Sequence, residues 1–208
     1  MKRRILVTGA DGMLGVDLVT ELRTQGREVI ASTVADMDIT CEARVRDALN
    51  AIRPDAVIHT AAYTAVDLAE KEKEKCLRVN TEGPVYLAGA CRDINADLMY
   101  ISTDYVFDGA SDNPYIETDK PGPASVYGLS KRLGEEAVAA LCPAHKICRT
   151  SWLIGPHGIT GTNFVEKILK AARDGRPLSV VSDQKGRPTF TFDLARLLIR
   201  LLDVPETG

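Results

Sequence analysis

The sequence predicts an α/β fold in which a parallel sheet is covered by helices on both faces. Short apolar runs recur along the chain, and each is followed by a stretch in which apolar residues return at helical spacing. The runs expected to form strands are residues 5–7, 28–31, 54–64, 98–102 and 146–150. Strands that alternate with helices in this way are typical of βαβ units, whose strands are parallel.

Length and composition limit the class of protein. The chain of 208 residues is long enough to bury a substantial core. Its formal net charge of -3 gives no reason to expect nucleic acid or a membrane surface as a partner. No apolar run reaches the length of a transmembrane helix. The five cysteines are scattered and lie apart from the three histidines, so we expect reduced thiols in a cytoplasmic protein and no metal site.

Three glycines follow the first strand at intervals of three residues, and a helical pattern then runs to about Gly26. Strand, glycine-rich turn and helix form the first unit of a Rossmann-like, doubly wound fold that binds a dinucleotide. We expect Gly9 to allow the tight turn, Gly12 to let the backbone approach the pyrophosphate, and Gly15 to let the helix pack closely on the strand. The pyrophosphate would lie at the helix N-terminus, where free N–H groups and the helix dipole favour an anion.

The turn after the second strand leaves the choice between NADH and NADPH open. An acid there would hold the adenosine ribose and a base would hold a 2′-phosphate, but residues 32–35 are Ser-Thr-Val-Ala. Arg3, Arg4 and Arg27 are the candidates to replace the missing base. Asp38 and Ile39 are placed to meet the adenine, although Asp38 has the alternative of helping to cap the next helix.

The rest of the chain continues the alternation. Thr40 is the expected N-cap of a helix over residues 42–52. The third strand, which contains His59 as a packed core residue, runs into small side chains that let a ligand approach the backbone. The remaining predictions are helices at 70–75, 80–95, 127–141, 163–172 and 192–202, a short strand at 178–181, and loops at 112–123 and 183–189.

A tyrosine and a lysine are four residues apart at the start of the helix from Tyr127, and therefore lie on one helix face. An ammonium held close to a phenol lowers the phenol's pKa, so we expect Lys131 to make Tyr127 a usable proton donor. Thr103, at the end of the fourth strand, would place a hydroxyl against the same substrate oxygen. The pair alone is a weak signal, but it stands in a chain that also carries a dinucleotide turn.

Several strings of residues resemble the extended short-chain dehydrogenases and, within them, the dTDP-4-dehydrorhamnose reductases. They are the glycine-rich turn, Ala-Ala-Tyr-Thr-Ala-Val-Asp at 61–67, Ser-Thr-Asp-Tyr-Val-Phe-Asp-Gly at 102–109, Tyr-Gly-Leu-Ser-Lys at 127–131, Arg-Thr-Ser-Trp at 149–152, Asn-Phe at 163–164 and the run at 183–189. The resemblance covers essentially the whole chain, and the string at 102–109 is its most specific part.

The resemblance implies an NAD(P)H-dependent reduction of the C4 keto group of dTDP-4-dehydro-L-rhamnose to dTDP-L-rhamnose. Tyr127 would protonate the C4 oxygen, Lys131 would tune Tyr127 and bind the nicotinamide ribose, and Thr103 would hydrogen-bond the reacting oxygen. Asp104, Tyr105 and Trp152 would hold the deoxysugar. The cofactor would be lined by Gly9, Gly12, Met13, Leu14, Asp38, Ile39, Ala62, Tyr63 and Thr64, together with Tyr127 and Lys131.

Two other functions fit the same strings. One is a reductase or epimerase of another nucleotide-sugar. The other is a non-catalytic NADP-binding protein resembling the regulatory subunit of methionine adenosyltransferase. The expected partner is a nucleotide-sugar substrate, and a homodimer is one option. Some relatives hold Mg2+ at a dimer contact, but no residue pattern here marks such a site.

The domain organisation expected is a dinucleotide-binding domain over residues 1–150. Elements of a substrate lobe at 151–208 would be interleaved with the end of its sheet. Proteins of this family continue beyond the point that matches Gly208, so the C-terminal lobe is expected to be incomplete.

Overall fold

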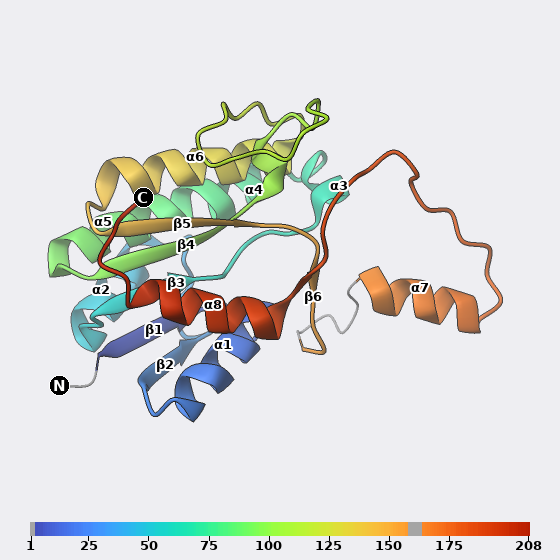
Figure 1. Ribbon diagram of the computed structural model, residues 1–208. Coiled ribbons are helices and arrows are strands. Elements are labelled where there is room, and N and C mark those ends of the chain that lie inside the picture. The colour runs from blue at the N-terminus through green and yellow to red at the C-terminus, as the bar shows by residue number, and fades with distance from the viewer. Residues whose placement is uncertain (1–2, 158–163) are drawn as a thin grey trace.

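A five-stranded parallel sheet forms the centre of the molecule in the computed structural model, which describes residues 3–157 and 164–208 (Figure 1). The strands are β1 (Arg4–Thr8), β2 (Glu28–Ser32), β3 (Ala56–His59), β4 (Asp97–Thr103) and β5 (His145–Thr150). Their order in the sheet is β2-β1-β3-β4-β5. The chain therefore crosses over β1 and winds outward in both directions, which confirms the doubly wound α/β fold.

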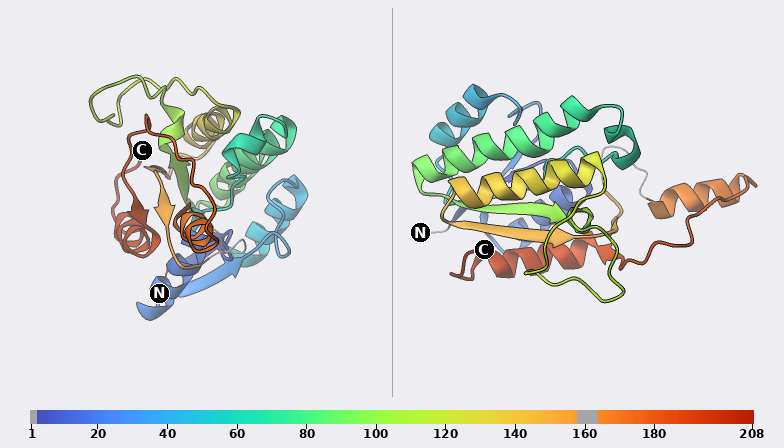
Figure 2. Two further views of the ribbon diagram at one scale, coloured as in Figure 1. Left: turned by 90° about the vertical axis from the view of Figure 1, so that its right-hand side faces the viewer. Right: turned by 90° about the horizontal axis from the view of Figure 1, so that it is seen from above.

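Helices cover both faces of this sheet (Figure 2). One face carries α1 (Met13–Thr24) and α8 (Thr191–Leu202), and the other carries α2 (Glu42–Ile52), α5 (Gly83–Ile94) and α6 (Val126–Leu141). Successive residues of a strand point to opposite faces. In β1, Ile5 and Val7 therefore pack with α1 and α8, while Leu6 packs with α2 and α5, and all three are fully buried.

The remaining elements are short or lie away from the sheet. They are α3 (Val66–Ala69), α4 (Lys73–Leu77), the π-helical turn η1 (Arg78–Glu82), the 3-10 turn η2 (Asp104–Val106), β6 (Leu153–Ile154), α7 (Phe164–Arg173) and β7 (Thr189–Phe190). β6 and β7 form a separate two-stranded parallel sheet. α7 projects from the body of the molecule (Figures 1 and 2).

Five local predictions differ from the structure. The third strand, expected over residues 54–64, is only Ala56–His59. Residues 178–181 form no strand, because the branched side chains there are exposed and pair with no other described strand. Thr40 does not cap α2: its N–H and hydroxyl donate to Asp38, and the helix begins after Cys41 without a side-chain cap. The helix predicted at 80–95 is divided into η1 and α5, and the one predicted at 70–75 is α4, which begins three residues later.

The boundaries of the other helices agree with the sequence. Asn163, the predicted start of α7, lies outside the described residues. The division of the chain at residue 150 stays a prediction. None of the described helices is both long and apolar enough to cross a membrane.

Candidate active site

The glycine-rich turn joins β1 to α1 at the carboxyl edge of the sheet. Gly9 has a φ of +64°, which glycine adopts without strain, and its carbonyl accepts a hydrogen bond of 2.9 Å from the Gly12 N–H. A Cβ on Gly9 would lie 2.7 Å from the Ala61 backbone, and one on Gly15 would lie 2.1 Å from the Gly9 carbonyl oxygen. The turn therefore packs against the first turn of α1, where close packing at Gly15 was predicted, and against the loop after β3, which the spacing did not predict.

A cleft of about 810 Å³ opens above this turn. Thr8, Thr60, Thr103 and Thr150, which end or follow strands β1, β3, β4 and β5, all line it. Parallel strands present their carboxyl ends at one edge, so residues far apart in the sequence meet there. The glycine turn, the N-terminus of α1 without a side-chain cap and the volume of the cleft fit a dinucleotide.

The three predicted catalytic side chains lie in this cleft. Ser125 caps α6 by accepting a hydrogen bond of 3.0 Å from the Gly128 N–H, which fixes the start of the helix beside η2. A Cβ on Gly128 would lie 2.2 Å from the Tyr105 carbonyl oxygen, so only glycine permits this approach. Tyr127 thereby lines the same cleft as Thr103.

Lys131 is directed onto β4 from the next turn of α6. Its Nζ donates a hydrogen bond of 2.6 Å to the Ile101 carbonyl and lies 4.1 Å from the centre of the Tyr100 ring. The side chain is only 2% exposed. Burial lowers the pKa of Lys131 to about 7, while the nearby charge of Glu135 acts in the opposite direction.

The prediction that Lys131 lowers the pKa of Tyr127 was wrong. Burial raises the pKa of Tyr127 to about 12, and the side chain of Thr103 only partly opposes this shift. The phenol is therefore fully protonated at neutral pH, which is the state that a proton donor needs. Burial was not evident from the spacing of the two residues, since it depends on β4 and η2.

A buried ion pair joins α6, the helix that carries Tyr127 and Lys131, to the sheet. Glu135, 1% exposed, accepts two hydrogen bonds of 2.8 Å from the guanidinium of Arg149 on β5. Arg132 adds a third contact at 3.3 Å. Burial raises the pKa of Glu135, but the hydrogen bonds and charges of its partners outweigh burial and leave this pKa below its usual value. The carboxylate therefore stays ionised and joins α6 to β5.

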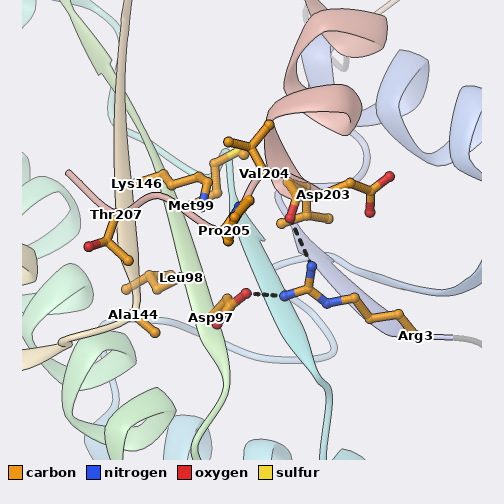
Figure 3. A pocket seen from close by; sticks show the side chains of 11 residues that line it. Arg3, Asp97, Leu98, Met99, Ala144, Lys146, Asp203, Val204, Pro205 and Thr207 are labelled. Carbon is orange, nitrogen blue, oxygen red and sulfur yellow. Dashed lines mark hydrogen bonds and ion pairs between the residues drawn. The ribbon is translucent and has the colours of Figure 1, made fainter.

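The three arginines proposed to hold a 2′-phosphate lie at the wrong edge of the sheet. Arg3 contacts Asp97 at the start of β4 and donates to the Leu202 carbonyl, in a separate small cavity (Figure 3). Arg4 pairs with Glu28 at 2.6 Å, and Arg27 pairs with Asp203. All three precede or begin a strand and so lie at its amino end, opposite the cleft. The prediction for them is therefore wrong.

The comparisons with known proteins match nearly the whole chain. Residues 2–207 match the model of the RmlD substrate binding domain family. A dTDP-4-dehydrorhamnose reductase of Streptomyces griseus is 47% identical over 199 residues, which are 95% of this chain and 64% of that protein. The spore coat polysaccharide biosynthesis protein SpsK of Bacillus subtilis is 46% identical over 97% of this chain and 70% of its own length. The chain belongs to the family of the dTDP-4-dehydrorhamnose reductases.

Solved structures of this family have the same fold. The dTDP-4-dehydrorhamnose reductase of Bacillus anthracis, whose structure holds NADP, is 39% identical and superposes with a TM-score of 0.95 over 100% of this chain and 73% of its own. The UDP-glucose 4-epimerase of Thermus thermophilus, with a TM-score of 0.81 and 23% identity, covers 98% of this chain and 76% of its own, and shares the fold. The chain thus spans about two thirds to three quarters of these relatives.

The cleft brings together nearly all residues that the sequence singled out for the family's cofactor and substrate. Those that line it are Gly9, Gly12, Met13, Leu14, Asp38, Ile39, Ala62, Thr64, Thr103, Asp104, Tyr105, Tyr127, Lys131 and Trp152. Tyr63 is not among the described lining residues, because its hydroxyl donates to Glu72 at 2.9 Å outside the cleft. Burial and, after it, the bond to Glu72 together raise the pKa of Tyr63 to about 12.

His59 lies in the core, as the sequence indicated, and Asp38 has a role that the sequence left open. His59 is 1% exposed, bonds Thr8 at 2.7 Å and stacks on Tyr100, so it is a core residue whose pKa burial lowers to about 3. Asp38 accepts from the Thr40 N–H and hydroxyl, which lowers its pKa and keeps it charged at the cleft wall. It does not cap α2.

Sequence reasoning missed several lining residues. They include Thr33, Val34, Met37, Val79, Thr150 and Phe164. Thr33 and Thr150 directly follow or end a strand, so the rule that ligands bind at carboxyl ends would have found them. The described residues contain no group of three or more His, Cys, Asp or Glu that could hold a metal ion.

Proposed function

We propose that this protein reduces the C4 keto group of dTDP-4-dehydro-L-rhamnose to dTDP-L-rhamnose with NADPH or NADH, and that Tyr127 donates the proton. The observation that carries the proposal is the meeting of Thr103, Tyr127 and Lys131 in the cleft above the glycine turn. The names of the relatives support the same activity. A bound nicotinamide would supply a hydride to C4, and the chain would supply the proton to the oxygen.

The side chains of the cleft suit a reaction in which the cofactor supplies the hydride and the protein supplies the proton. Tyr127 is protonated at neutral pH and lines the same cleft as Thr103, so both hydroxyls are available to one carbonyl oxygen. The oxygen gains negative charge as the carbon is reduced, and donors held in place stabilise that charge. Lys131, with a pKa of about 7, can take part in replacing the proton that Tyr127 gives up.

Asp104, Tyr105 and Trp152 are proposed to hold the sugar. Tyr105 lies edge-on to Tyr127, with 5.7 Å between ring centres, and so forms the wall next to the reacting carbon. Trp152 is 43% exposed and offers a ring face at the mouth of the cleft. Burial raises the pKa of Asp104, whose carboxylate accepts from the Thr103 hydroxyl at 3.2 Å.

We propose that the protein uses both NADPH and NADH as cofactors. Lys131 is the only cation among the described residues that line the cleft, so no arginine is among those lining residues to hold a 2′-phosphate. Measuring KM for NADPH and NADH with one substrate tests this; a difference of less than about tenfold is expected, because a dedicated phosphate contact is worth at least about 1.5 kcal/mol.

The test of the main proposal is the oxidation of NADPH, followed by absorbance, with a panel of keto-sugars. Wild-type protein should oxidise NADPH with dTDP-4-dehydro-L-rhamnose and much more slowly with UDP- or GDP-linked keto-sugars. Tyr127→Phe should lower kcat by about 10²–10⁴-fold, the usual contribution of a positioned proton donor. Binding of NADPH without turnover of any sugar would favour the non-catalytic alternative.

A second candidate substrate has specific support. A dTDP-4-keto-6-deoxy-D-glucose reductase of Streptomyces niveus is 43% identical over 100% of this chain and 72% of its own length. The same cleft would then reduce a dTDP-linked keto-sugar of different ring stereochemistry. Comparing kcat/KM for the two dTDP-sugars distinguishes the candidates.

A cytoplasmic location and a homodimer are also proposals. The five cysteines are all free, which is the state that a reducing compartment maintains. Light scattering of the purified protein tests the homodimer, which a monomeric mass would exclude.

A further inference from the structure

Trp152 has a backbone conformation that is uncommon for a bulky side chain. It lies between the end of β5 and the start of β6, and its φ is +46°. A bulky residue with a positive φ is an outlier that persists only where its surroundings fix it. Trp152 also lines the cleft. The contacts that hold this backbone therefore also place the indole at the cleft.

Hydrogen bonds join the backbone around Trp152 to the segment that runs into β7. The Thr189 N–H donates to the Trp152 carbonyl at 3.1 Å, and the Ser151 hydroxyl donates to the Arg187 carbonyl at 3.1 Å. β6 pairs with β7 directly afterwards, with Leu153 opposite Thr189. The chain around the tryptophan is thus bound to a segment 36 residues later.

The indole of Trp152 packs against Gly186, which belongs to the same segment. A Cβ on Gly186 would lie 2.5 Å from Cε2 of the indole, 2.8 Å from Cζ2 and 2.9 Å from Nε1. These distances are shorter than any ordinary contact between carbon atoms. No side chain can therefore occupy position 186 unless the indole or the backbone moves.

The indole, and not the backbone, is the part that would move. The backbone is held on both sides of the contact by the hydrogen bonds to Arg187 and from Thr189. The side chain of Trp152 is exposed, so the ring has room to turn. A Cβ on Gly175, which begins the same outer segment, would meet nothing within 4 Å. The close contact at Gly186 is thus specific to the tryptophan.

We propose that Gly186 is a positioning residue that sets the orientation of the Trp152 indole for contact with the sugar. The identity of the sugar rests on the proposed function, whereas the contact between Gly186 and the ring stands without it. Contact with an aromatic ring depends on the orientation of that ring, so a ring that turns contacts its ligand less well. Gly186 acts through the indole and is not among the described residues that line the cleft.

The test compares Gly186→Ala with Gly89→Ala as the matched control, because a Cβ on Gly89 of α5 would meet nothing within 4 Å. Trp152 is the single tryptophan of the chain, so its fluorescence reports on this indole alone. Gly186→Ala should shift the emission maximum and increase quenching by acrylamide. It should also raise the Kd for dTDP-L-rhamnose about tenfold, the size of one lost aromatic contact, and leave the Kd for NADP unchanged. Gly89→Ala should change none of these properties.

A second variant separates action through the indole from a general loss of structure. Trp152→Phe removes the larger ring, so adding Gly186→Ala to it should cause no further rise in the Kd for dTDP-L-rhamnose. An equal rise in both backgrounds would refute action through the indole. A lower melting temperature of Gly186→Ala with native fluorescence and native Kd would show a merely structural role and overturn the proposal.

The double variant also decides the matter if Gly186→Ala alone does not fold. The phenyl ring leaves room for the new Cβ, so the double variant should fold and bind dTDP-L-rhamnose as Trp152→Phe does. Failure of the double variant to fold would overturn the contact with the indole as the reason for glycine at this position.

The positioning role and the proposed function fail in different ways. Wild-type protein that binds NADP but no dTDP-linked sugar would refute the proposed substrate, and the fluorescence of Gly186→Ala would still test how the indole is held. Wild-type protein that binds dTDP-L-rhamnose, together with a Gly186→Ala variant that binds it equally well, would refute the positioning role alone.

Discussion

Replacing the buried lysine of the cleft should stabilise the protein while abolishing its activity. Lys131→Met keeps the length of the side chain and removes the ammonium, which lies 2% exposed against β4. The folded protein disfavours the charged form, since burial lowers the pKa of Lys131 from 10.5 to about 7. Sites that carry out chemistry commonly cost stability in this way.

The size of the effect follows from linkage. The gap between 10.5 and about 7 corresponds to roughly 5 kcal/mol, at 1.36 kcal/mol for each pKa unit. Because the folded pKa is the lower one, this cost is complete below about pH 7 and vanishes above the unfolded value. Methionine leaves the Ile101 carbonyl without its donor, which costs about 2 kcal/mol. The net gain for Lys131→Met is therefore about 3 kcal/mol near pH 6 and about zero near pH 9.

The measurement is urea unfolding of wild-type protein and Lys131→Met at these two pH values. The variant should have the higher unfolding free energy at the acidic value, and the difference should shrink as the pH rises. A variant that is less stable than wild type near pH 6, or a difference that grows with pH, would refute the assignment of Lys131 as a buried base with a lowered pKa.

Three further predictions concern the frame of the site. Gly15→Ala should cost about 1–3 kcal/mol of stability by urea unfolding and abolish NADP binding, since its Cβ would lie 2.1 Å from the Gly9 carbonyl oxygen; native binding would contradict the packing. Arg149→Ala leaves the carboxylate of Glu135 buried with a weaker partner and should cost about 3–5 kcal/mol by the same measurement, against less than 1 kcal/mol if the pair were a surface one. Arg27→Ala should leave the ratio of KM values for NADPH and NADH unchanged, because Arg27 lies at the far edge of the sheet; a shift toward NADH would show that it reaches the 2′-phosphate.

The sequence predicted those parts of the fold that local pattern determines. The glycine turn and the start of α6 are short-range features, and the alternation of strands and helices implies a parallel sheet. The error at Arg3, Arg4 and Arg27 was avoidable, because a residue that precedes a strand lies at its amino end. Residues 178–181 have strand-like composition, but a strand needs a partner, which composition does not reveal.

Other properties of the site depend on tertiary contacts. The raised pKa of Tyr127 comes first from burial, which β4 and η2 create around a residue of α6. Asn80, whose side-chain amide donates to the Tyr63 carbonyl and to Ser130 Oγ, gave no signal in the sequence, because these partners are 17 and 50 residues away. Side chains that act on the backbone of a distant loop are found only when the loops are seen together.

The contact between the Gly9 turn and the Ala61 backbone has a consequence for how this family can diversify. The turn after β1 and the loop after β3 are in van der Waals contact at the base of the cleft. Neither segment can therefore accept an insertion or a bulkier residue without displacing the other. The outer segments that begin at Gly109 and Gly175 carry no such constraint at these glycines, where a Cβ would meet nothing within 4 Å. New sugar preferences should therefore arise by changes in these outer segments, while the base of the cleft is inherited unaltered.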